Sequence, residues 1–530
     1  MQNKDEVQDQ DHPESGTNHN QGFYMYKQHN TLARIGPITP PTRVQRNMST
    51  STPKIAIVGA GPAGCMLARL LHLASIPVTI FEGEASPDFR SQGGTLDLHT
   101  STGLAALKQA GLFQEFLSKA RYDGDHLQIT DRHLKVFLER AGPPAPVESG
   151  RDSTDNAARS RLMEQRPEID RADLRRILVD SLPPSIVRWN HRVTSVSSGT
   201  GTLSFSNPSL PPATGFALIV GADGAWSKVR TAAFPSSQKP LYSGVGLYEL
   251  SVPSPETTAP ELHAAVKGGS LFAHAEHRRL CVQQMGDGSL SVYAIQAQEK
   301  EDWVSSSPPS SNPASNPGKP PTSDSLEAVK SHLLSGPAAP FGQDWHPLLQ
   351  QAISKAQGKC VPRSLYHLPV GYRWTHTRGA TLIGDAAHLM TPFAGEGVNV
   401  ALEDAMRLAS GIVSALAPGT SQRGKEASEP KNRGTNNEEI SNDEMKEKEQ
   451  LGLLDKVVQD FEEEMWIRAE KVARLTDQLT KLWMFEKDTP ASVIAKTSAL
   501  HVKFDKPGVL HPLVDVVVYG YFFCKRLVGR

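Results

Sequence analysis

Three short apolar segments around residues 54–81 predict a strand, a helix and a second strand in succession. Lys54 to Val58 (KIAIV) is a β-branched run that ends at a glycine, which is typical of a buried strand. Residues 62–74 carry apolar side chains at helical spacing, and Pro77 to Phe81 (PVTIF) is a second strand-like run. This order predicts a parallel sheet with a right-handed βαβ crossover. Two later runs, Phe216 to Val220 and Ala380 to Ile383, predict further buried strands.

Between residues 241 and 375 the pattern changes to short, partly alternating segments separated by turn residues. Alternation of this kind is typical of an antiparallel sheet with one covered face. We therefore expect a second domain inserted into the first. The segments are Gly244–Val252, Leu271–Ala275, Leu280–Gln284 and Leu290–Gln296.

A long helical stripe follows near the C-terminal end. Leu453 to Lys487 carries apolar residues at helical spacing, which predicts one amphipathic helix of about 50 Å. We expect it to lie along both domains as a brace, and coiled-coil dimerisation is the alternative. The stripe consists of Leu454, Val457, Val458, Phe461, Met465, Ala469, Val472, Leu475, Leu479 and Leu482.

Three segments are too polar to form a core. Residues 1–52, Ser305 to Ser325 and Pro418 to Gln450 are expected to be disordered, because they bury too little apolar surface to offset their ordering entropy. Residues 1–52 also lack the apolar run of a secretory signal. We hypothesise that translation starts at Met48. An intact Met1 peptide in mass spectrometry of the native protein would contradict this.

The apolar segment from Val509 to Phe523 is interrupted by Pro512 and Asp515, and it is too short to span a bilayer. We expect it to pack on the rest of the chain. Interfacial membrane contact is the alternative, helped by the basic residues Lys525, Arg526 and Arg530.

Composition excludes several classes of function. A formal net charge of −1 gives no indication of a nucleic-acid or other polyanionic partner. The four cysteines have no metal-ligand spacing, which favours free thiols in a reducing, cytoplasmic compartment and predicts no metal. His274 and His277 have no third partner in the sequence, so we expect them in a surface loop or at a strand end. The cysteines are Cys65, Cys281, Cys360 and Cys524.

The first chemical motif is the glycine-rich turn from Gly59 to Gly64 (GAGPAG), which follows a predicted strand and opens a predicted helix. Gly59 suits the tight turn, Gly61 permits close approach of a pyrophosphate, and Gly64 permits close packing of helix on strand. The helix N-terminus offers free N–H groups to phosphates. Glu82 ends the second strand, where its carboxylate can accept hydrogen bonds from ribose hydroxyls.

Two further glycine-and-acid turns follow predicted strands. Asp223 lies in GADG directly after Phe216–Val220, at a strand end where α/β folds place ligand contacts, although a plain turn is the alternative. Asp385 follows the strand that ends at Ile383, and is expected to contact cofactor hydroxyls. Beyond it, a glycine-rich loop opens a helix whose N-terminal amides can hold an anion such as the edge of a reduced flavin. The residues of that helix start are Gly395, Gly397, Val398 and Asn399.

His388 lies in the same motif (GDAAHLM). We interpret it as structural or cofactor-packing, and not as an acid–base catalyst, because no orienting carboxylate is evident beside it in the sequence. His367 and Tyr366 are candidate acid–base groups of the inserted domain, and no catalytic side chain is assigned.

In this order, the three motifs resemble those of group A FAD-dependent monooxygenases, the p-hydroxybenzoate hydroxylase-like family. The likeness extends over roughly residues 53–415, without the 305–325 insert. It is most marked for the tetracycline-inactivating monooxygenases and the fungal monooxygenases of natural-product pathways. The strings that carry it are RSQGGTLDLH (Arg90–His99), PEIDRADLR (Pro167–Arg175) and GDAAHLM (Gly384–Met390).

The resemblance implies roles for individual residues. Arg90 would contact NADPH, whereas Asp97, Arg171 and Asp385 would contact FAD. Surface ion pairs are the alternative for the two arginines, and a turn or cap role for Asp97. Glu396 departs from the pattern, because the tetracycline-inactivating relatives typically carry Gln there. A carboxylate near a reduced flavin would be mildly unfavourable unless it points away.

The resemblance also implies the reaction. FAD would take a hydride from NADPH, react with O₂ and deliver oxygen from a C4a-hydroperoxide to the substrate. The substrate is expected to be a hydrophobic, aromatic secondary metabolite held between the inserted sheet and the flavin. A Baeyer–Villiger oxidation, a halogenase or reductase, and a non-catalytic flavin-binding redox sensor are the alternatives. The GWxWxIP signature of the halogenases is absent. No second GxGxxG occurs, so no separate nicotinamide-binding domain is expected.

The predicted architecture is an α/β fold with a Rossmann-like FAD-binding domain, an inserted mixed or antiparallel β-sheet domain and a long C-terminal helix. We expect a cytoplasmic monomer whose partners are a small hydrophobic substrate and O₂. The predicted segments are 1–52 (extension), 53–240 and 376–417 (FAD-binding domain), 241–375 (substrate domain), 418–450 (linker) and 451–530 (helical region).

Overall fold

The computed structural model describes residues 52–86, 93–122, 126–140, 166–303, 326–416, 442–504, 506 and 508–528, all within the compact unit Pro37–Arg530. Its first sheet has five strands in the order β16-β10-β1-β2-β7, and all neighbouring pairs are parallel. β1, β2, β10 and β16 are the four strands expected from the apolar runs. The strands are β1 (Ile55–Val58), β2 (Val78–Phe81), β7 (Val187–Arg188), β10 (Leu218–Gly221) and β16 (Ala380–Leu382).

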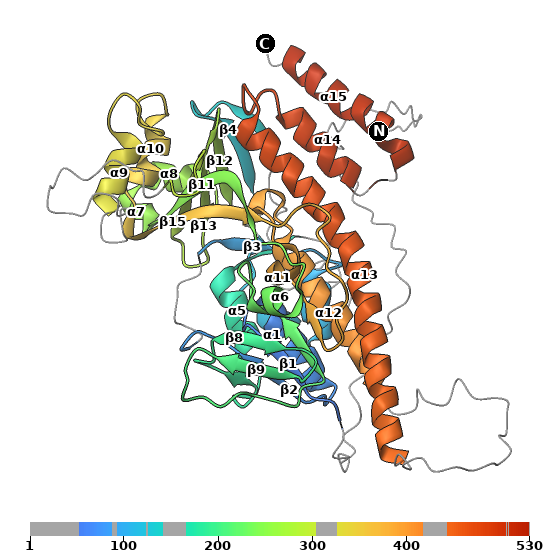
Figure 1. The fold of residues 1–530 in the computed structure, drawn as a ribbon. Coiled ribbons are helices and arrows are strands. Elements are labelled where there is room, and N and C mark those ends of the chain that lie inside the picture. The colour runs from blue at the N-terminus through green and yellow to red at the C-terminus, as the bar shows by residue number, and fades with distance from the viewer. Residues whose placement is uncertain are drawn as a thin grey trace, which may run out of the picture. The chain divides into compact units, whose positions relative to one another are not determined.

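Helices that cover this sheet come from both ends of the motif-bearing region (Figure 1). α1 (Pro62–Leu73) packs against α12 (Gly397–Leu416) and α5 (Arg171–Asp180). Their apolar faces, with the sheet, form one core in which Met66, Leu67 and Leu408 are inaccessible to solvent. The crossover from β1 through α1 to the parallel strand β2 confirms the predicted βαβ unit.

The second sheet has seven strands in the order β15-β11-β14-β13-β12-β4-β5. Its central pairs are antiparallel, as expected, but β12 and β4 run parallel, so the sheet is mixed. β4 and β5 precede residue 241, and so this sheet is not confined to the 241–375 segment. The strands are β4 (Leu127–Asp131), β5 (Val136–Arg140), β11 (Leu241–Val252), β12 (Ser270–Ala275), β13 (Arg278–Gln284), β14 (Leu290–Ala297) and β15 (Gln357–His367).

One face of the second sheet is covered by α8 (Pro260–Val266), α9 (Leu326–Leu334) and α10 (Pro347–Ser354), which bury Trp345 and Tyr248 among aliphatic side chains. The opposite face packs Cys281 and Ile295 near Met484 of α13. The remaining short elements are β3 (Thr95–Asp97), β6 (Glu168–Asp170), β8 (Val193–Ser197), β9 (Thr202–Phe205), α2 (Gly103–Gln109), α3 (Phe113–Leu117), α6 (Lys228–Ala233), α7 (Pro255–Thr258), α11 (Asp385–His388) and η3 (Pro392–Ala394).

The long helix α13 runs from Asn442 to Phe485. It lies along both the domain with the five-stranded sheet and the domain with the seven-stranded sheet (Figure 1). Its predicted stripe is buried within the same chain: Val458 and Met465 join the first core, and Leu479 joins a third core beside the second sheet. The stripe is therefore used as a brace, and its burial leaves no seam for a coiled coil. The helix starts earlier than expected, inside the 418–450 segment, because residues 442–450 are rich in Glu and Lys, which favour helix without needing burial.

A buried carboxylate fixes this brace to the first domain. Glu462 on α13 is fully buried and accepts hydrogen bonds from Trp374 Nε1 (3.1 Å), Thr381 Oγ1 (2.8 Å) and His376 Nδ1 (2.7 Å). Burial raises the pKa of Glu462, against the opposing effect of these donors. The chain then ends in α14 (Ile494–Phe504), η5 (Gly508–Leu510) and α15 (His511–Val528).

Candidate flavin-binding site

The glycine-rich turn has two glycines that the fold requires and one that leaves space. Gly59 has a φ of +103°, and a Cβ there would lie 2.4 Å from the Ala222 carbonyl oxygen. A Cβ on Gly64 would lie 2.1 Å from the Gly59 oxygen, which confirms its role in close packing. A Cβ on Gly61 would meet no described atom within 4 Å. The open position is the N-cap of α1, where a pyrophosphate would approach the helix amides.

Glu82 holds the backbone around this turn. Its Oε2 accepts a hydrogen bond from Ala60 N (2.7 Å), and its Oε1 accepts one from Glu84 N (2.9 Å). Sequence reasoning missed the neighbouring pair, in which Arg175 Nη2 donates to Glu84 Oε2 (2.6 Å) and Arg175 Nε donates to Ala60 O (3.3 Å). Arg175 and Glu84 are both buried, so a buried ion pair fixes the backbone of this turn at Ala60.

Asp223 is engaged by its own turn. Its Oδ1 accepts from Ser227 Oγ (2.5 Å), and its Oδ2 accepts from Lys228 N (2.6 Å) and Val229 N (3.3 Å), at the start of α6. Burial raises the pKa of Asp223 despite these donors. The carboxylate therefore caps a helix, and contact with a cofactor stays a prediction.

Asp385, unlike Asp223, has a carboxylate that no described residue engages. It follows β16 and the Gly384 turn (φ +60°), its side chain is exposed, and it has no hydrogen bond or ion pair to any described residue. Arg171, at the start of α5, is likewise exposed and has no ion pair with any residue that the structure describes. Arg90 lies outside the described residues. Asp385 and Arg171 thus retain their full hydrogen-bonding capacity for a ligand.

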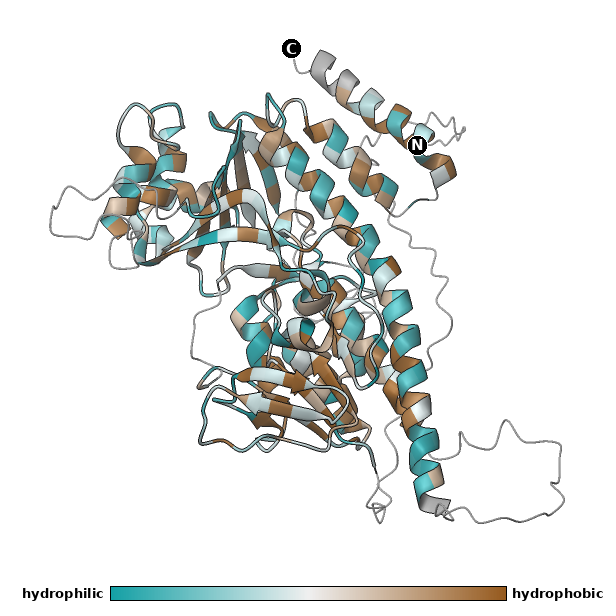
Figure 2. Cartoon of the chain, in the orientation of Figure 1, coloured by the Kyte–Doolittle hydropathy of each residue, from teal (hydrophilic) through white to brown (hydrophobic). Residues whose placement is uncertain are grey.

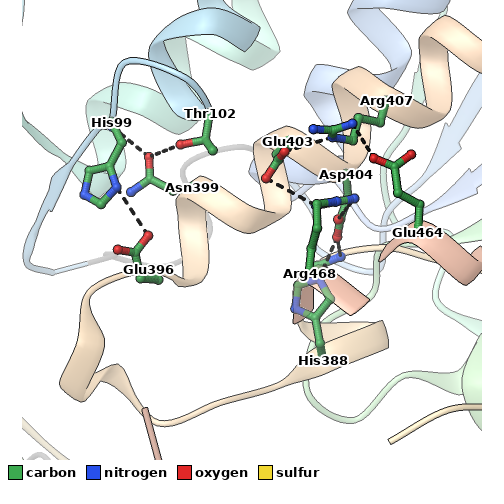
Figure 3. Close-up of polar contacts among 11 residues, drawn as sticks. His99, Thr102, His388, Glu396, Asn399, Glu403, Asp404, Arg407, Glu464 and Arg468 are labelled. Atoms are coloured by element: carbon green, nitrogen blue, oxygen red, sulfur yellow. Dashed lines mark hydrogen bonds and ion pairs between the residues drawn. The ribbon is translucent and has the colours of Figure 1, made fainter. Parts of the chain in front are cut away.

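His388 has the carboxylate partner that the sequence did not reveal. Its Nε2 lies 2.6 Å from Asp404 Oδ2, and both side chains are buried (Figure 3). Asp404 also accepts from Gly384 N (3.1 Å) and from Arg468 Nη2 on α13 (3.3 Å). The expectation that His388 has no orienting carboxylate was therefore wrong. The carboxylate was missed because Asp404 lies 16 residues further along the chain, on the next α-helix, α12. The pair is sealed in the core, which keeps His388 in a structural role.

The start of α12 is tied to the loop after β3 by Asn399 (Figure 3). Asn399 is fully buried, its Oδ1 accepts from His99 N (2.9 Å) and Thr102 Oγ1 (3.2 Å), and its Nδ2 donates to Asp97 O (2.9 Å). Gly397, like Gly61, would place a Cβ in open space. Val398 packs partly buried against the first core, so it orients this helix start.

Glu396 is paired with an imidazole. Its Oε2 lies 3.3 Å from His99 Nδ1, and His99 Nε2 lies 3.2 Å from Asp97 Oδ2 (the former contact is drawn in Figure 3). Burial alone would lower the pKa of His99, but the two carboxylates outweigh it and raise that pKa to about 9. A protonated His99 therefore offsets the charge of Glu396, which removes the objection to a carboxylate at this position.

We expect the His99 imidazolium to make stability pH-dependent. A raised pKa gives a contribution that is complete below about 6.5, the ordinary histidine value, and is lost as the pH rises through about 9. Urea unfolding at intervals from pH 6 to 10 should show a decline on the order of 1–3 kcal/mol that Glu396→Gln reduces and His99→Asn removes. An unchanged profile in His99→Asn would contradict the pairing.

The three motifs meet at one edge of the first sheet. β1, β10 and β16 are adjacent and parallel, so the turns that follow them lie side by side. A Cβ on Gly59 would contact Ala222 and Asp223, and one on Gly384 would lie 3.4 Å from Ala63 Cβ. A Cβ on Gly395 would lie 3.6 Å from Asp97 Oδ1. The turns at Gly59, Asp223 and Gly384–Asp385 therefore lie side by side at this edge, and the loop at Gly395 lies beside Asp97, the last residue of β3.

Other candidates lie elsewhere. Tyr366 donates to Glu301 Oε1 (2.8 Å), and His367 Nδ1 lies 2.9 Å from Leu368 O. His274 is at the end of a strand, as expected, but it is buried and not on the surface. Among the described residues, no group of three or more potential ligands could hold a metal ion.

Comparisons with known proteins agree with this geometry. The FAD binding domain family matches residues 52–306 and 348–430. The chain is 32% identical to monooxygenase penA of Penicillium thymicola (68% of this chain, 84% of the relative) and 32% identical to monooxygenase asqM of Emericella nidulans (67% and 83%).

Solved structures show the same fold at low identity. Klebsiella pneumoniae HpxO complexed with FAD and uric acid has a TM-score of 0.57 at 15% identity, covering 88% of this chain and 97% of that one. A salicylate hydroxylase substrate complex has a TM-score of 0.56 at 17% identity, covering 88% and 99%. With a family match over most of its length and relatives at 32% identity, the chain belongs to the group A FAD-dependent monooxygenases.

Proposed function

We propose that the chain uses NADPH and O₂ to hydroxylate an aromatic secondary metabolite. The observation that carries the proposal is the meeting of three glycine-and-acid turns at one sheet edge, with open space at Gly61 and Gly397 and an exposed Asp385 that pairs with no described residue. The curated relatives penA and asqM are named as monooxygenases. We also propose a cytoplasmic monomer; the described cysteines Cys65, Cys281 and Cys360 are free thiols, as a reducing compartment favours.

The residues present fit FAD. The α1 N-terminus at Gly61 would hold the pyrophosphate, Asp385 would accept hydrogen bonds from hydroxyl groups, and the α12 N-terminus at Gly397 would face the anionic edge of the reduced ring. Bound FAD, reduced by NADPH, would supply the redox chemistry that activates O₂, so that one oxygen atom reaches the substrate and the other leaves as water. The protein's part is to orient the cofactor and to exclude solvent.

The substrate would lie against the second sheet's inner face, which presents an arginine among aromatic rings. Arg279 on β13 lies over Phe272 (4.4 Å to the ring centroid), and within 5.6 Å of the Phe393 ring and 6.0 Å of the Trp483 ring. Phe393 belongs to η3, in the loop that leads to Gly397. Arg279 has no ion pair with any described carboxylate, unlike Arg278 beside it, which pairs with Asp344.

A buried histidine adjoins this arginine. His274 is the cross-strand partner of Arg279, is 1% exposed, and its ring is 4.2 Å from that of Trp483. Neither ring nitrogen has a hydrogen-bond partner among the described residues. Burial, with Arg279 nearby, holds the pKa of His274 well below its usual value, so the ring is neutral. We propose that Arg279 and His274 bind an acidic oxygen of the substrate, a phenolate or carboxylate. The aromatic ring of the substrate would then pack against Phe393 and Trp483.

The test is the reaction of purified protein with NADPH, ¹⁸O₂ and a library of aromatic metabolites, followed by mass spectrometry. A product heavier by one ¹⁸O atom, with NADPH consumption that rises on addition of substrate, is the expected result. Ring expansion to a labelled ester would instead show a Baeyer–Villiger reaction. A yellow protein without turnover on any compound would favour the redox sensor and overturn the proposal.

For the substrate identified in that way, Arg279→Met should raise KM by about 10- to 100-fold, with a smaller change in kcat. The reason is the loss of a charge-assisted contact made to bound substrate before reaction. Methylation of the acidic oxygen of the substrate should raise KM more for the wild type than for Arg279→Met. Arg278→Met is the matched control, since its side chain pairs on the far side with Asp344, and equal effects of both variants would refute the role of Arg279.

A further inference from the structure

The terminal helix α15 leaves an apolar face uncovered. Its inner side packs on α14, with Val518 (1% exposed) and Phe522 (7%) in the third core. The opposite side exposes large apolar residues, which Figure 2 shows as hydrophobic stretches on α15. The exposed residues of η5 and α15 are Val509 (85%), Leu510 (41%), Leu513 (62%), Val516 (71%), Val517 (57%), Tyr519 (44%) and Tyr521 (46%). A continuous patch of this kind marks an interaction surface.

Its arrangement is that of an amphipathic interfacial helix. Leu513, Val516 and Val517 follow helical spacing, and at about 100° per residue the two tyrosines fall on opposite edges of the face. Tyrosine favours the boundary between headgroups and acyl chains, because its ring is apolar and its hydroxyl is polar.

The charges on this helix suit an anionic surface. The acidic residue of α15, Asp515, is paired with Lys503 of α14 (2.6 Å), so it does not oppose an anionic partner. In the sequence, the basic residues Lys525, Arg526 and Arg530 follow this apolar segment. Basic residues beside an apolar helix face add attraction to acidic headgroups.

Other occupants fit less well. The segments of this chain outside the description are polar and supply no apolar run of comparable length. We propose that α15 docks the enzyme on a phospholipid bilayer surface, with the helix axis in the plane of the interface.

This is contact with one leaflet and not a crossing: within the described residues, every helix is too short or too polar to pass through a bilayer. The proposal does not depend on the oxygenase reaction, because it concerns a face of α15 and not the flavin-binding turns.

The test is flotation of the full-length, FAD-loaded protein with vesicles of phosphatidylcholine and phosphatidylserine in a two-to-one ratio. We expect the wild type to float with these vesicles and to bind pure phosphatidylcholine more weakly. The triple variant Leu513→Gln, Val516→Gln, Val517→Gln should lower the bound fraction on the order of tenfold or more, because glutamine removes apolar contact but keeps the helix.

The matched control is Ile467→Gln, which changes a residue that is 67% exposed on α13. It should float like the wild type, and all variants should keep their FAD content and thermal midpoint. Wild-type protein that stays unbound in both vesicle types overturns the proposal. A wild-type dimer in light scattering that the triple variant converts to monomer would assign the face to a second copy instead.

Discussion

Gly61→Val should fold normally and fail to retain FAD. A side chain at this position meets no described atom, so the fold has room for it, but it occupies the space above the α1 N-terminus. A pyrophosphate held there needs close approach to the backbone, and its loss should weaken FAD binding on the order of 100-fold or more. The measurement is the ratio of flavin to protein absorbance after gel filtration, with thermal unfolding of the apoprotein alongside.

Two other glycines separate a binding effect from a folding effect. Gly64→Val would force a Cβ to within 2.1 Å of the Gly59 oxygen, so that variant should unfold. Gly199→Val lies in the β8–β9 turn with open space around it and should retain both fold and flavin. If Gly61→Val came off the column with full flavin occupancy, the pyrophosphate site would have to lie elsewhere.

Local patterns were enough to predict the parts of the site that depend on neighbours in the chain. A strand followed by a glycine turn and a helix is a contiguous signal, so Gly59, Gly61 and Gly64 were placed from the sequence alone. The same holds for the turns at Asp223 and Asp385, because parallel strands bring their carboxyl ends to one edge. The amphipathic stripe of α13 also predicted its buried side, since the 3.6-residue period is set by backbone geometry.

Contacts between distant segments could not be predicted in this way. Glu84 and Arg175 are 91 residues apart, and their pairing depends on how α5 packs beneath the first turn. Glu462 and Thr381 meet across 81 residues, and nothing in either local sequence names the other. The strand β4 joins the second sheet by pairing with β12, although some 140 residues separate them along the chain. Each of these required the tertiary structure.

Asp404 is the residue of this kind whose loss should be most costly to stability. It is fully buried and joins three segments: the Gly384 turn, His388 and Arg468 of the brace helix. Asp404→Ala leaves the buried His388 and the partly buried Arg468 without their shared carboxylate, so we expect the free energy of unfolding to fall by about 3–5 kcal/mol. Urea unfolding measures it. Glu464→Gln, which changes an exposed partner of Arg407, is the control and should shift stability by no more than about 0.5 kcal/mol.

The pairing of Asp404 with His388 also predicts how the free energy of unfolding depends on pH. Burial alone would raise the pKa of Asp404, but His388 and Arg468 outweigh it and lower that pKa, so its contribution is present above about 3.9 and lost as the pH falls through the lowered value. Burial alone would lower the pKa of His388, but Asp404 raises it, so its contribution is complete below about 6.5 and lost as the pH rises through the raised value. The stability difference between wild type and Asp404→Asn should therefore be largest between about pH 4 and 6.5. A difference that stayed constant across this range and beyond it would mean that the two side chains do not titrate as a pair, and that Asp404 acts only through its hydrogen bond to Gly384.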